Sequence, residues 1–140
     1  MIRHNNPKSR RFIIINFLEN NNKLTYLNKV EKIEPFDWRQ IIPIFKDEKL
    51  MEALIEKITD VNQPNELGIN LIHYAVKYGT AKTLRVLIRC GADINRLDIF
   101  RIPPIVYAVI GGQMDIIDIL MRADDDIVIT DEILQKFYYL

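Results

Sequence analysis

Apolar residues recur at helical spacing along the second half of the chain, separated by short polar stretches. Between residues 71 and 78, the apolar positions 71, 72, 75 and 76 lie on one face of a helix. A second apolar face follows over residues 81–90, and we expect Gly79, between the two, to end the first helix in the left-handed conformation. The same pattern predicts further helices over residues 104–111, 114–122 and 50–58.

The pattern repeats with a period of 33 residues. When residues 66–98 are set above residues 99–131, eleven of the 33 positions are identical. The identities include Tyr74-Ala75-Val76 with Tyr107-Ala108-Val109, Gly79 with Gly112, Leu87 with Leu120, and Asp98 with Asp131. A pair of short helices cannot bury its own apolar face, so each pair has to stack on a neighbour. The sequence therefore predicts an all-α array of stacked helix pairs.

These units resemble the ankyrin repeat. The resemblance is carried by Gly68-Ile69-Asn70-Leu71-Ile72-His73-Tyr74-Ala75 and by Leu84-Arg85-Val86-Leu87-Ile88-Arg89-Cys90-Gly91-Ala92-Asp93-Ile94-Asn95, whose closing Gly-Ala-Asp-Ile-Asn is the most specific part. It is strong over residues 66–98 and moderate over 99–131, and residues 33–65 retain a degenerate repeat. The resemblance implies an all-α ankyrin-repeat solenoid of stacked helix-turn-helix units with divergent terminal caps.

This register divides the chain into three regions. Residues 33–131 are expected to form the ankyrin repeats, and residues 1–32 a basic N-terminal segment or a degenerate cap. Residues 132–140 are expected to form a C-terminal capping helix or the start of an incomplete repeat. In the second clear repeat, Arg101 stands where the first has Gly68. If that position keeps a left-handed backbone, the arginine costs about 1 kcal/mol there.

Residues that could carry chemistry are few and scattered. His4, His73 and Cys90 do not cluster with carboxylates at metal-ligand spacing. Gly111-Gly112 is not followed by the lysine of a phosphate-binding loop, and no pair of nucleophile and base is evident. The resemblance to ankyrin repeats gives His73 a structural role, a hydrogen bond to the backbone of the adjacent turn. We therefore expect no enzymatic activity, no metal and no cofactor.

Composition narrows the class of partner and the compartment. The 19 Lys and Arg residues balance 19 Asp and Glu residues, so the chain lacks the positive charge typical of nucleic-acid binders. Its longest apolar run, residues 12–18, is too short to span a membrane. The single Cys90 and the absence of an Asn-x-Ser/Thr acceptor favour the cytoplasm or another reducing intracellular compartment. High usage of Ile, Asn and Lys resembles that of intracellular bacteria and large viruses with AT-rich genomes, which would place the protein in a host cell.

The resemblance also implies where a partner would bind. In ankyrin proteins, the connecting turns and the exposed face of each first helix line the concave side, which typically holds a protein. The corresponding positions here, mostly apolar, are Glu66, Leu67, Ile69, Lys77, Tyr78, Leu97, Ile99, Phe100, Ile102 and Ile110. Because turns face water, the four apolar residues from Leu97 to Ile102 are expected to form an exposed patch of the kind that marks an interface. Alternatively, they pack between neighbouring turns, or the N-terminal segment or a second subunit covers them.

Two functions fit these observations. The first is a non-catalytic adaptor or inhibitor that binds a protein partner through its concave face, as a monomer rather than an oligomer and without nucleic acid or membrane. The second is the repeat portion, or a decayed copy, of a larger ankyrin-containing effector or enzyme. For either function, composition makes host–pathogen interaction the expected biological setting.

Overall fold

The chain folds into helices joined by turns and loops over residues 10–123, the range that the computed structural model describes. Within this range there are eight helices and no strand, so the all-α prediction is confirmed. In chain order they are α1 (Arg10–Glu19), α2 (Lys23–Lys29), the 3-10 helix η2 (Trp38–Lys46), α3 (Glu48–Glu56), α4 (Leu71–Tyr78), α5 (Ala81–Arg89), α6 (Pro104–Ile110) and α7 (Met114–Ala123). The predicted C-terminal segment, residues 132–140, lies outside the described residues, as do residues 1–9.

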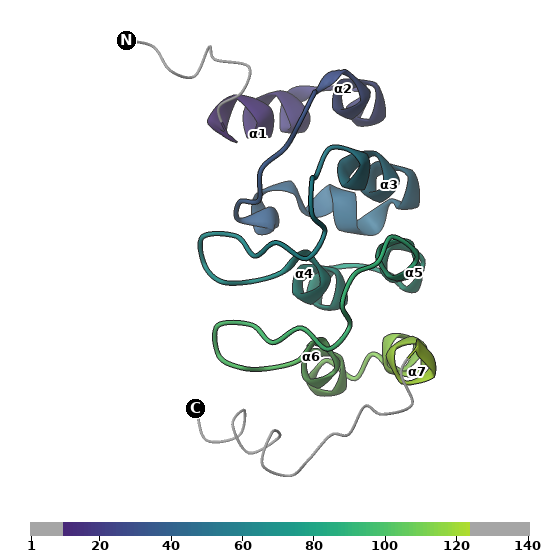
Figure 1. Ribbon diagram of the computed structural model, residues 1–140. Helices are drawn as coiled ribbons and strands as arrows, with labels where there is room; N and C mark the ends of the chain where they lie inside the picture. Colours follow the sequence, from purple (N-terminus) through teal and green to yellow (C-terminus); the bar gives the residue numbers. More distant parts are fainter. Residues whose placement is uncertain (1–9, 124–140) are drawn as a thin grey trace.

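Consecutive helices form pairs, here called layers, that stack on one another in one direction (Figure 1). The second helices of the layers, α3, α5 and α7, lie one beneath another in one column. The first helices form a parallel column, in which η2 contacts α4 and α4 contacts α6. Each layer thus packs on its neighbours along the chain, which is the solenoid that the repeat predicts.

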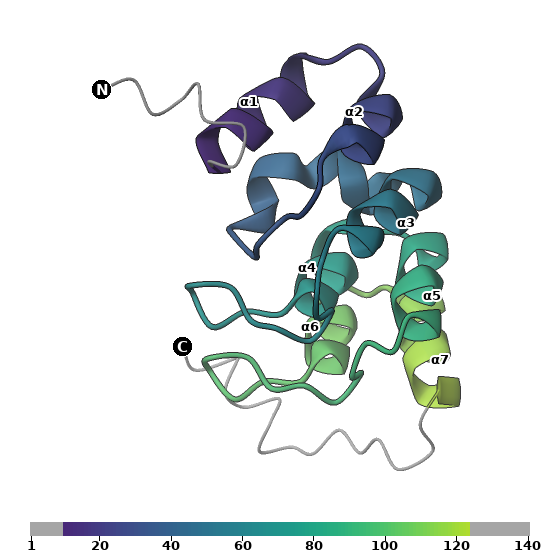
Figure 2. The ribbon, with the colours of Figure 1, turned by 45° about the horizontal axis from the view of Figure 1, so that its top comes forward.

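Two long loops project from the same side of the stack (Figure 2). The first finger loop comprises residues 57–70, between α3 and α4, and the second finger loop comprises residues 90–103, between α5 and α6. Both lie beside the column of first helices, and the second follows the first along the stack. This side of the molecule therefore carries the turns that are predicted to line the binding face.

Left-handed backbone recurs at equivalent positions of the repeat. Gly68 has a φ of 71° in the first finger loop, and Arg101 has a φ of 62° in the second. The conformation is therefore kept where a side chain replaces glycine, at the expected cost of about 1 kcal/mol. Gly91 and Gly112, with φ of 90° and 64°, follow the ends of α5 and α6.

Gly79 ends α4 in a way that differs from the prediction. Its φ of −95° and ψ of −168° are extended, so the expected left-handed conformation is wrong. A Cβ atom at this position would lie 2.4 Å from the carbonyl oxygen of Ala75 and 2.8 Å from Oγ1 of Thr83. Thr80 begins α5 immediately afterwards, and Thr83 completes its capping box. The glycine is required by the tight packing of the turn between α4 and α5.

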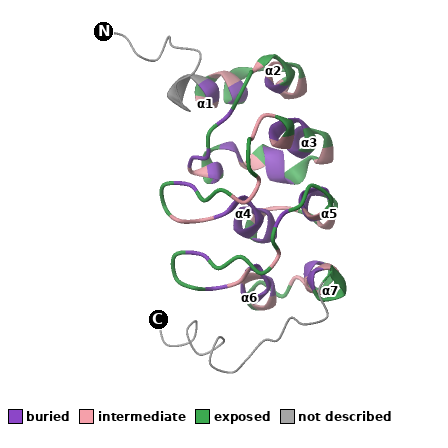
Figure 3. Ribbon diagram, in the orientation of Figure 1, coloured by how far each residue is buried: buried purple, intermediate pink, exposed green. Residues whose placement is uncertain are grey.

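Buried side chains follow the surfaces on which the layers meet (Figure 3). Leu87 and Leu120, the equivalent residues of α5 and α7, are completely buried. Ala75 and Ala108 are also completely buried, and their small side chains allow α4 and α6 to approach closely. The predicted core faces of these four helices are thereby confirmed.

The degenerate repeat has a 3-10 helix in place of a regular first helix. Pro43 lies inside η2, and Ile41 has non-helical angles, so the segment is kinked. Its large side chains, including Trp38 and Phe45, are nevertheless buried. Helices α1 and α2 pack on this layer and bury Phe17, so the core continues into the N-terminal helix pair.

Candidate functional site

Each finger loop is closed by one polar side chain at the same place in the repeat. The Oδ1 atom of Asn65 accepts the backbone N–H groups of the second and fourth residues after it, at 3.0 and 3.1 Å. Oδ1 of Asp98, one period later, accepts the equivalent two N–H groups at 2.9 and 3.0 Å. Because both side chains are buried, each loop is fixed from within.

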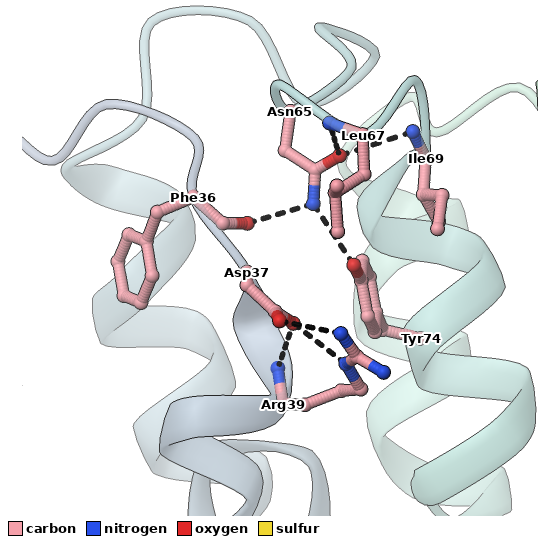
Figure 4. Close-up of polar contacts among 7 residues, drawn as sticks. All are labelled: Phe36, Asp37, Arg39, Asn65, Leu67, Ile69 and Tyr74. Atoms are coloured by element: carbon pink, nitrogen blue, oxygen red, sulfur yellow. Dashed lines mark hydrogen bonds and ion pairs between the residues drawn. The ribbon is translucent and has the colours of Figure 1, made fainter.

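The same two side chains also contact a tyrosine of the helix that follows. Nδ2 of Asn65 donates to the hydroxyl of Tyr74 at 2.9 Å and to the carbonyl of Phe36 at 2.8 Å (Figure 4). The hydroxyl of Tyr107 donates to the carboxylate of Asp98. Burial and this hydrogen bond raise the pKa of Tyr107, so its hydroxyl keeps its proton. The finger loops are therefore tied to α4 and α6.

His73 joins the α4 layer to the second finger loop. Its Nε2 atom donates a hydrogen bond to the carbonyl of Ile102 at 3.0 Å, as the family resemblance implies. Its ring meets the ring of Tyr107 edge-on, with 5.9 Å between the ring centres. Burial lowers the pKa of His73 below the ordinary value of 6.5, so the ring is neutral in the folded protein at pH 7.

A groove of about 430 Å³ lies between the two finger loops and α4. The residues lining it are Arg39, Glu66, Leu67, Ile69, Tyr74, Lys77, Tyr78, Ile99 and Phe100. All except Arg39 and Tyr74 are among the positions predicted from the sequence. Ile99 and Phe100 are 61% and 64% exposed, so the tip of the second finger loop presents apolar surface to solvent.

Three predicted residues are not part of the groove. Ile102 is only 3% exposed, so its assignment to an exposed patch is wrong. Its N–H group bonds to Asp98 and its carbonyl to His73, and these bonds hold the residue against the core. Leu97 and Ile110 are 45% and 47% exposed, but they do not line the groove.

Arg39 and Tyr74 are lining residues that the sequence analysis missed. Arg39 belongs to η2 and pairs with Asp37 through Nε and Nη2, at 2.8 and 2.6 Å (Figure 4). This hydrogen-bonded ion pair lowers the pKa of Asp37. Tyr74 could have been found from its recurrence as Tyr107 one period later. Arg39 gives no such signal, because the degenerate repeat around it has lost the register.

The charged groups at the edge of the groove are engaged with neighbours. Nζ of Lys77 lies 4.2 Å from the centre of the Tyr107 ring, which is a cation–π contact between α4 and α6. Burial lowers the pKa of Lys77, and the nearby Asp98 opposes that shift. Since Arg39 is paired with Asp37, the groove combines an apolar lining with charges that are already partly compensated.

A comparison with known proteins identifies the family. The family model described as ankyrin repeats (3 copies) matches residues 42–131. The chain belongs to the ankyrin repeat family. Ankyrin repeats are generally protein-interaction modules, and the family is typically non-catalytic.

Two ankyrin repeat proteins of fowlpox virus (strain NVSL) are similar to this ankyrin chain. FPV244 is 32% identical over 99 residues, which are 69% of this chain and 14% of FPV244. FPV223 is 28% identical over 80 residues, which are 56% of this chain and 57% of FPV223. The chain thus spans a small part of one relative and little more than half of the other.

Metal and membrane features were also sought in the described part of the ankyrin chain. Residues 10–123 contain no group of three or more His, Cys, Asp or Glu side chains placed to hold a metal ion. No helix among those same residues has the length and apolar character needed to cross a membrane.

Proposed function

We propose that this ankyrin chain is a non-catalytic adaptor or inhibitor that binds a protein partner through the groove and the tips of the finger loops. The observation that carries the proposal is the exposure of large apolar side chains at those tips. Leu67 is 45% exposed, Ile99 61% and Phe100 64%. Exposed apolar residues gathered beside a groove are typical of surfaces that bind other proteins.

The finger loops suit this role because their conformation is fixed in the unbound protein. Asn65 and Asp98 each hold their loop through two backbone N–H groups and a tyrosine hydroxyl. A partner therefore loses little free energy in ordering the loops when it binds. Apolar and aromatic side chains on such a support are where the binding energy of an interface concentrates.

The groove favours a protein partner over a nucleic acid. Binding to a phosphate backbone requires several cations that are free to face it. In the groove, Arg39 is paired with Asp37, Lys77 lies over Tyr107, and Glu66 adds a carboxylate. The proposed partner is a protein that places apolar side chains between the finger loops, and one copy of this chain binds it.

The proposed setting is the cytoplasm of a host cell, in an interaction between a pathogen protein and a host protein. The two similar ankyrin repeat proteins both come from fowlpox virus, which supports this setting. A second candidate function is that of a repeat portion acting within a larger protein. The small share of FPV244 that the chain matches, 14%, supports that candidate.

The proposal is tested by comparing Phe100→Ala with Leu18→Ala, whose side chain is 50% exposed on α1, away from the groove lining. Proteins captured from a cell lysate by the wild-type chain are titrated calorimetrically against both variants. We expect Phe100→Ala to weaken binding by about 1–2 kcal/mol, because an anchor of the interface is removed. Leu18→Ala should bind as the wild type does.

Circular dichroism melts provide the folding control. Both variants should melt as the wild type does, because neither side chain is buried. If Phe100→Ala binds every captured protein with wild-type affinity, the groove is not the binding site. If it unfolds the chain while the folded fraction keeps its affinity, Phe100 is a packing residue and the binding face lies elsewhere.

A further inference from the structure

The last described layer leaves part of an apolar face uncovered. Met51 of α3 and Leu84 of α5 occupy the same place in the repeat and are completely buried, whereas Ile117 of α7 is only partly buried. Likewise Val76 of α4 is completely buried, and its equivalent Val109 of α6 is only partly buried. Because α6 and α7 cover α4 and α5, the difference marks the face of α6 and α7 on which a further layer would stack.

Residues 126–140 of this chain carry the repeat register beyond α7. Asp126-Ile127 matches Asp93-Ile94, and Asp131 matches Asp98. In the second finger loop, Asp93 accepts the N–H group of the second residue after it at 2.9 Å and thereby shapes the start of the loop. Asp98 closes the tip of the same loop. The segment after α7 therefore has the side chains that shape a finger loop, at the same spacing.

The spacing also places a helix start within this segment. The second finger loop ends at residue 103 and α6 begins at Pro104. One period of 33 residues later, the next first helix would begin at Phe137. Phe137 and Tyr138 would take the places of Pro104 and Ile105, which are both buried. Two aromatic side chains would then supply apolar surface to the uncovered face.

Contacts between the finger tips carry over with opposite charges. The Cβ position of Gly68 lies 3.1 Å from Cβ of Ile99, where the tip of the second finger loop touches the first. One period later, this pair of positions is occupied by Arg101 and Glu132. The exposed arginine of the second finger loop would therefore meet a carboxylate, which is a favourable pairing.

Contacts between the first helices carry over with apolar side chains. Nζ of Lys77 lies 4.2 Å from the centre of the Tyr107 ring, across α4 and α6. One period later, the two positions are Ile110 and Leu140. Ile110 is 47% exposed on α6, so an apolar neighbour would remove apolar surface from water.

From these matches we propose that residues 126–140 dock on α6 and α7 of the same chain, as a third finger loop followed by the start of a further first helix. Glu132 lies beside Arg101, and Leu140 packs on Ile110. The occupant is this segment because it follows α7 directly and matches the face in spacing, charge and apolar character. Docking closes the end of the stack and extends the concave face by one finger loop.

The contact at the finger tips can be tested by cysteine cross-linking in the full chain. Cys90→Ser removes the exposed natural thiol. In that background, the pair Arg101→Cys and Glu132→Cys is compared with the out-of-register pair Arg101→Cys and Lys136→Cys. Cβ atoms in contact across neighbouring finger tips suit a disulfide bond. We expect the in-register pair to form an intramolecular disulfide at least about tenfold faster, because docking raises the local concentration of the two thiols.

Non-reducing electrophoresis and mass spectrometry distinguish the products. Equal rates for the two pairs would overturn the proposal, because the segment would then have no fixed register on the second finger loop. Cross-linked dimers as the main product would also overturn it, since a second copy would then occupy the face. The same holds if neither pair oxidises. Both pairs share Arg101→Cys, so any effect of that substitution on folding is common to them.

Discussion

The anchors of the two finger loops use different chemistry at equivalent positions. Asn65 serves as both acceptor and donor, because its Nδ2 atom donates to the carbonyl of Phe36 at 2.8 Å. Asp98 serves as an acceptor, since two backbone N–H groups and the hydroxyl of Tyr107 donate to it. An amide can therefore satisfy both environments, whereas a carboxylate satisfies the second alone.

This asymmetry predicts the outcome of exchanging the two residues. Asn65→Asp removes the donor to the Phe36 carbonyl and places a charge in a buried site, so the free energy of unfolding should fall by about 1–3 kcal/mol. Asp98→Asn keeps an acceptor for the loop and offers Nδ2 to Tyr107, so the change should be about 1 kcal/mol or less. Equilibrium urea unfolding measures both values. A larger loss for Asp98→Asn would contradict this assignment of donors.

For single residues, the sequence predicts exposure on the loops better than burial. Ile99 and Phe100 are exposed as expected, because apolar residues in a turn cannot all reach the core. Ile102 is buried because its backbone bonds to Asp98 and to His73, which lies 29 residues away, and such a contact leaves no trace in the local pattern. Arg39 enters the groove from a layer in which no repeat register remains.

For helices, the bounds are predicted closely where the repeat is regular. Helices α4 to α7 begin and end within one residue of the predicted segments. α3 lies two residues nearer the N-terminus than predicted, because Asp47 caps it by accepting the N–H group of Leu50. η2 is missed because Pro43 interrupts the helical hydrogen bonds, and α1 and α2 because they match no repeat.

The turn between α4 and α5 should tolerate no side chain at Gly79. A Cβ atom there would lie 2.4 Å from the Ala75 carbonyl oxygen, so we expect Gly79→Ala to lower the free energy of unfolding by about 1–3 kcal/mol or more. Gly91 is the control, because its φ is 90° and nothing lies within 4 Å of a Cβ. Gly91→Asn should cost less than about 1 kcal/mol, since asparagine accepts a left-handed backbone. Thermal and urea unfolding of both variants would show whether close packing or backbone angle governs each glycine.

Adjacent residues of α7 provide a test of its buried face. Leu120 is completely buried, and its neighbour Met121 is 48% exposed. We expect Leu120→Ala to cost about 2–5 kcal/mol, because a cavity replaces apolar contacts. Met121→Ala should stay within about 0.5 kcal/mol of the wild type. Melting temperatures measure the difference, and a Leu120→Ala variant that melts with the wild type would show that this face does not carry the stack.

For the whole molecule, the neutral state of His73 couples stability to pH. Burial lowers its pKa in the folded protein, whereas the unfolded chain binds a proton near the ordinary value of 6.5. The unfolded state therefore holds more protons below this pH, and the free energy of unfolding should fall by up to about 1.4 kcal/mol per pH unit as the pH decreases. The loss affects the whole stack, because His73 lies at the junction between the α4 layer and the second finger loop.

Urea unfolding between about pH 7.5 and about pH 5.5 measures this dependence. His73→Gln is the control, because its amide can still donate to the Ile102 carbonyl but does not titrate. We expect the variant to be less stable at neutral pH and nearly independent of pH over this interval. If the wild type and the variant show the same slope, another group is responsible for the pH dependence.

Neighbouring layers are joined by hydrogen bonds that run from a side chain to the main chain. Asn65 donates to the carbonyl of Phe36, Thr83 to that of Phe45, and His73 to that of Ile102. The donor is fixed by the chemistry of its side chain, whereas every residue type supplies the acceptor. Mutations on the accepting side can therefore accumulate without breaking the junction. The degenerate layer around η2 is on the accepting side of the first two bonds, so it could drift away from the family pattern during evolution and still remain stacked on its neighbour.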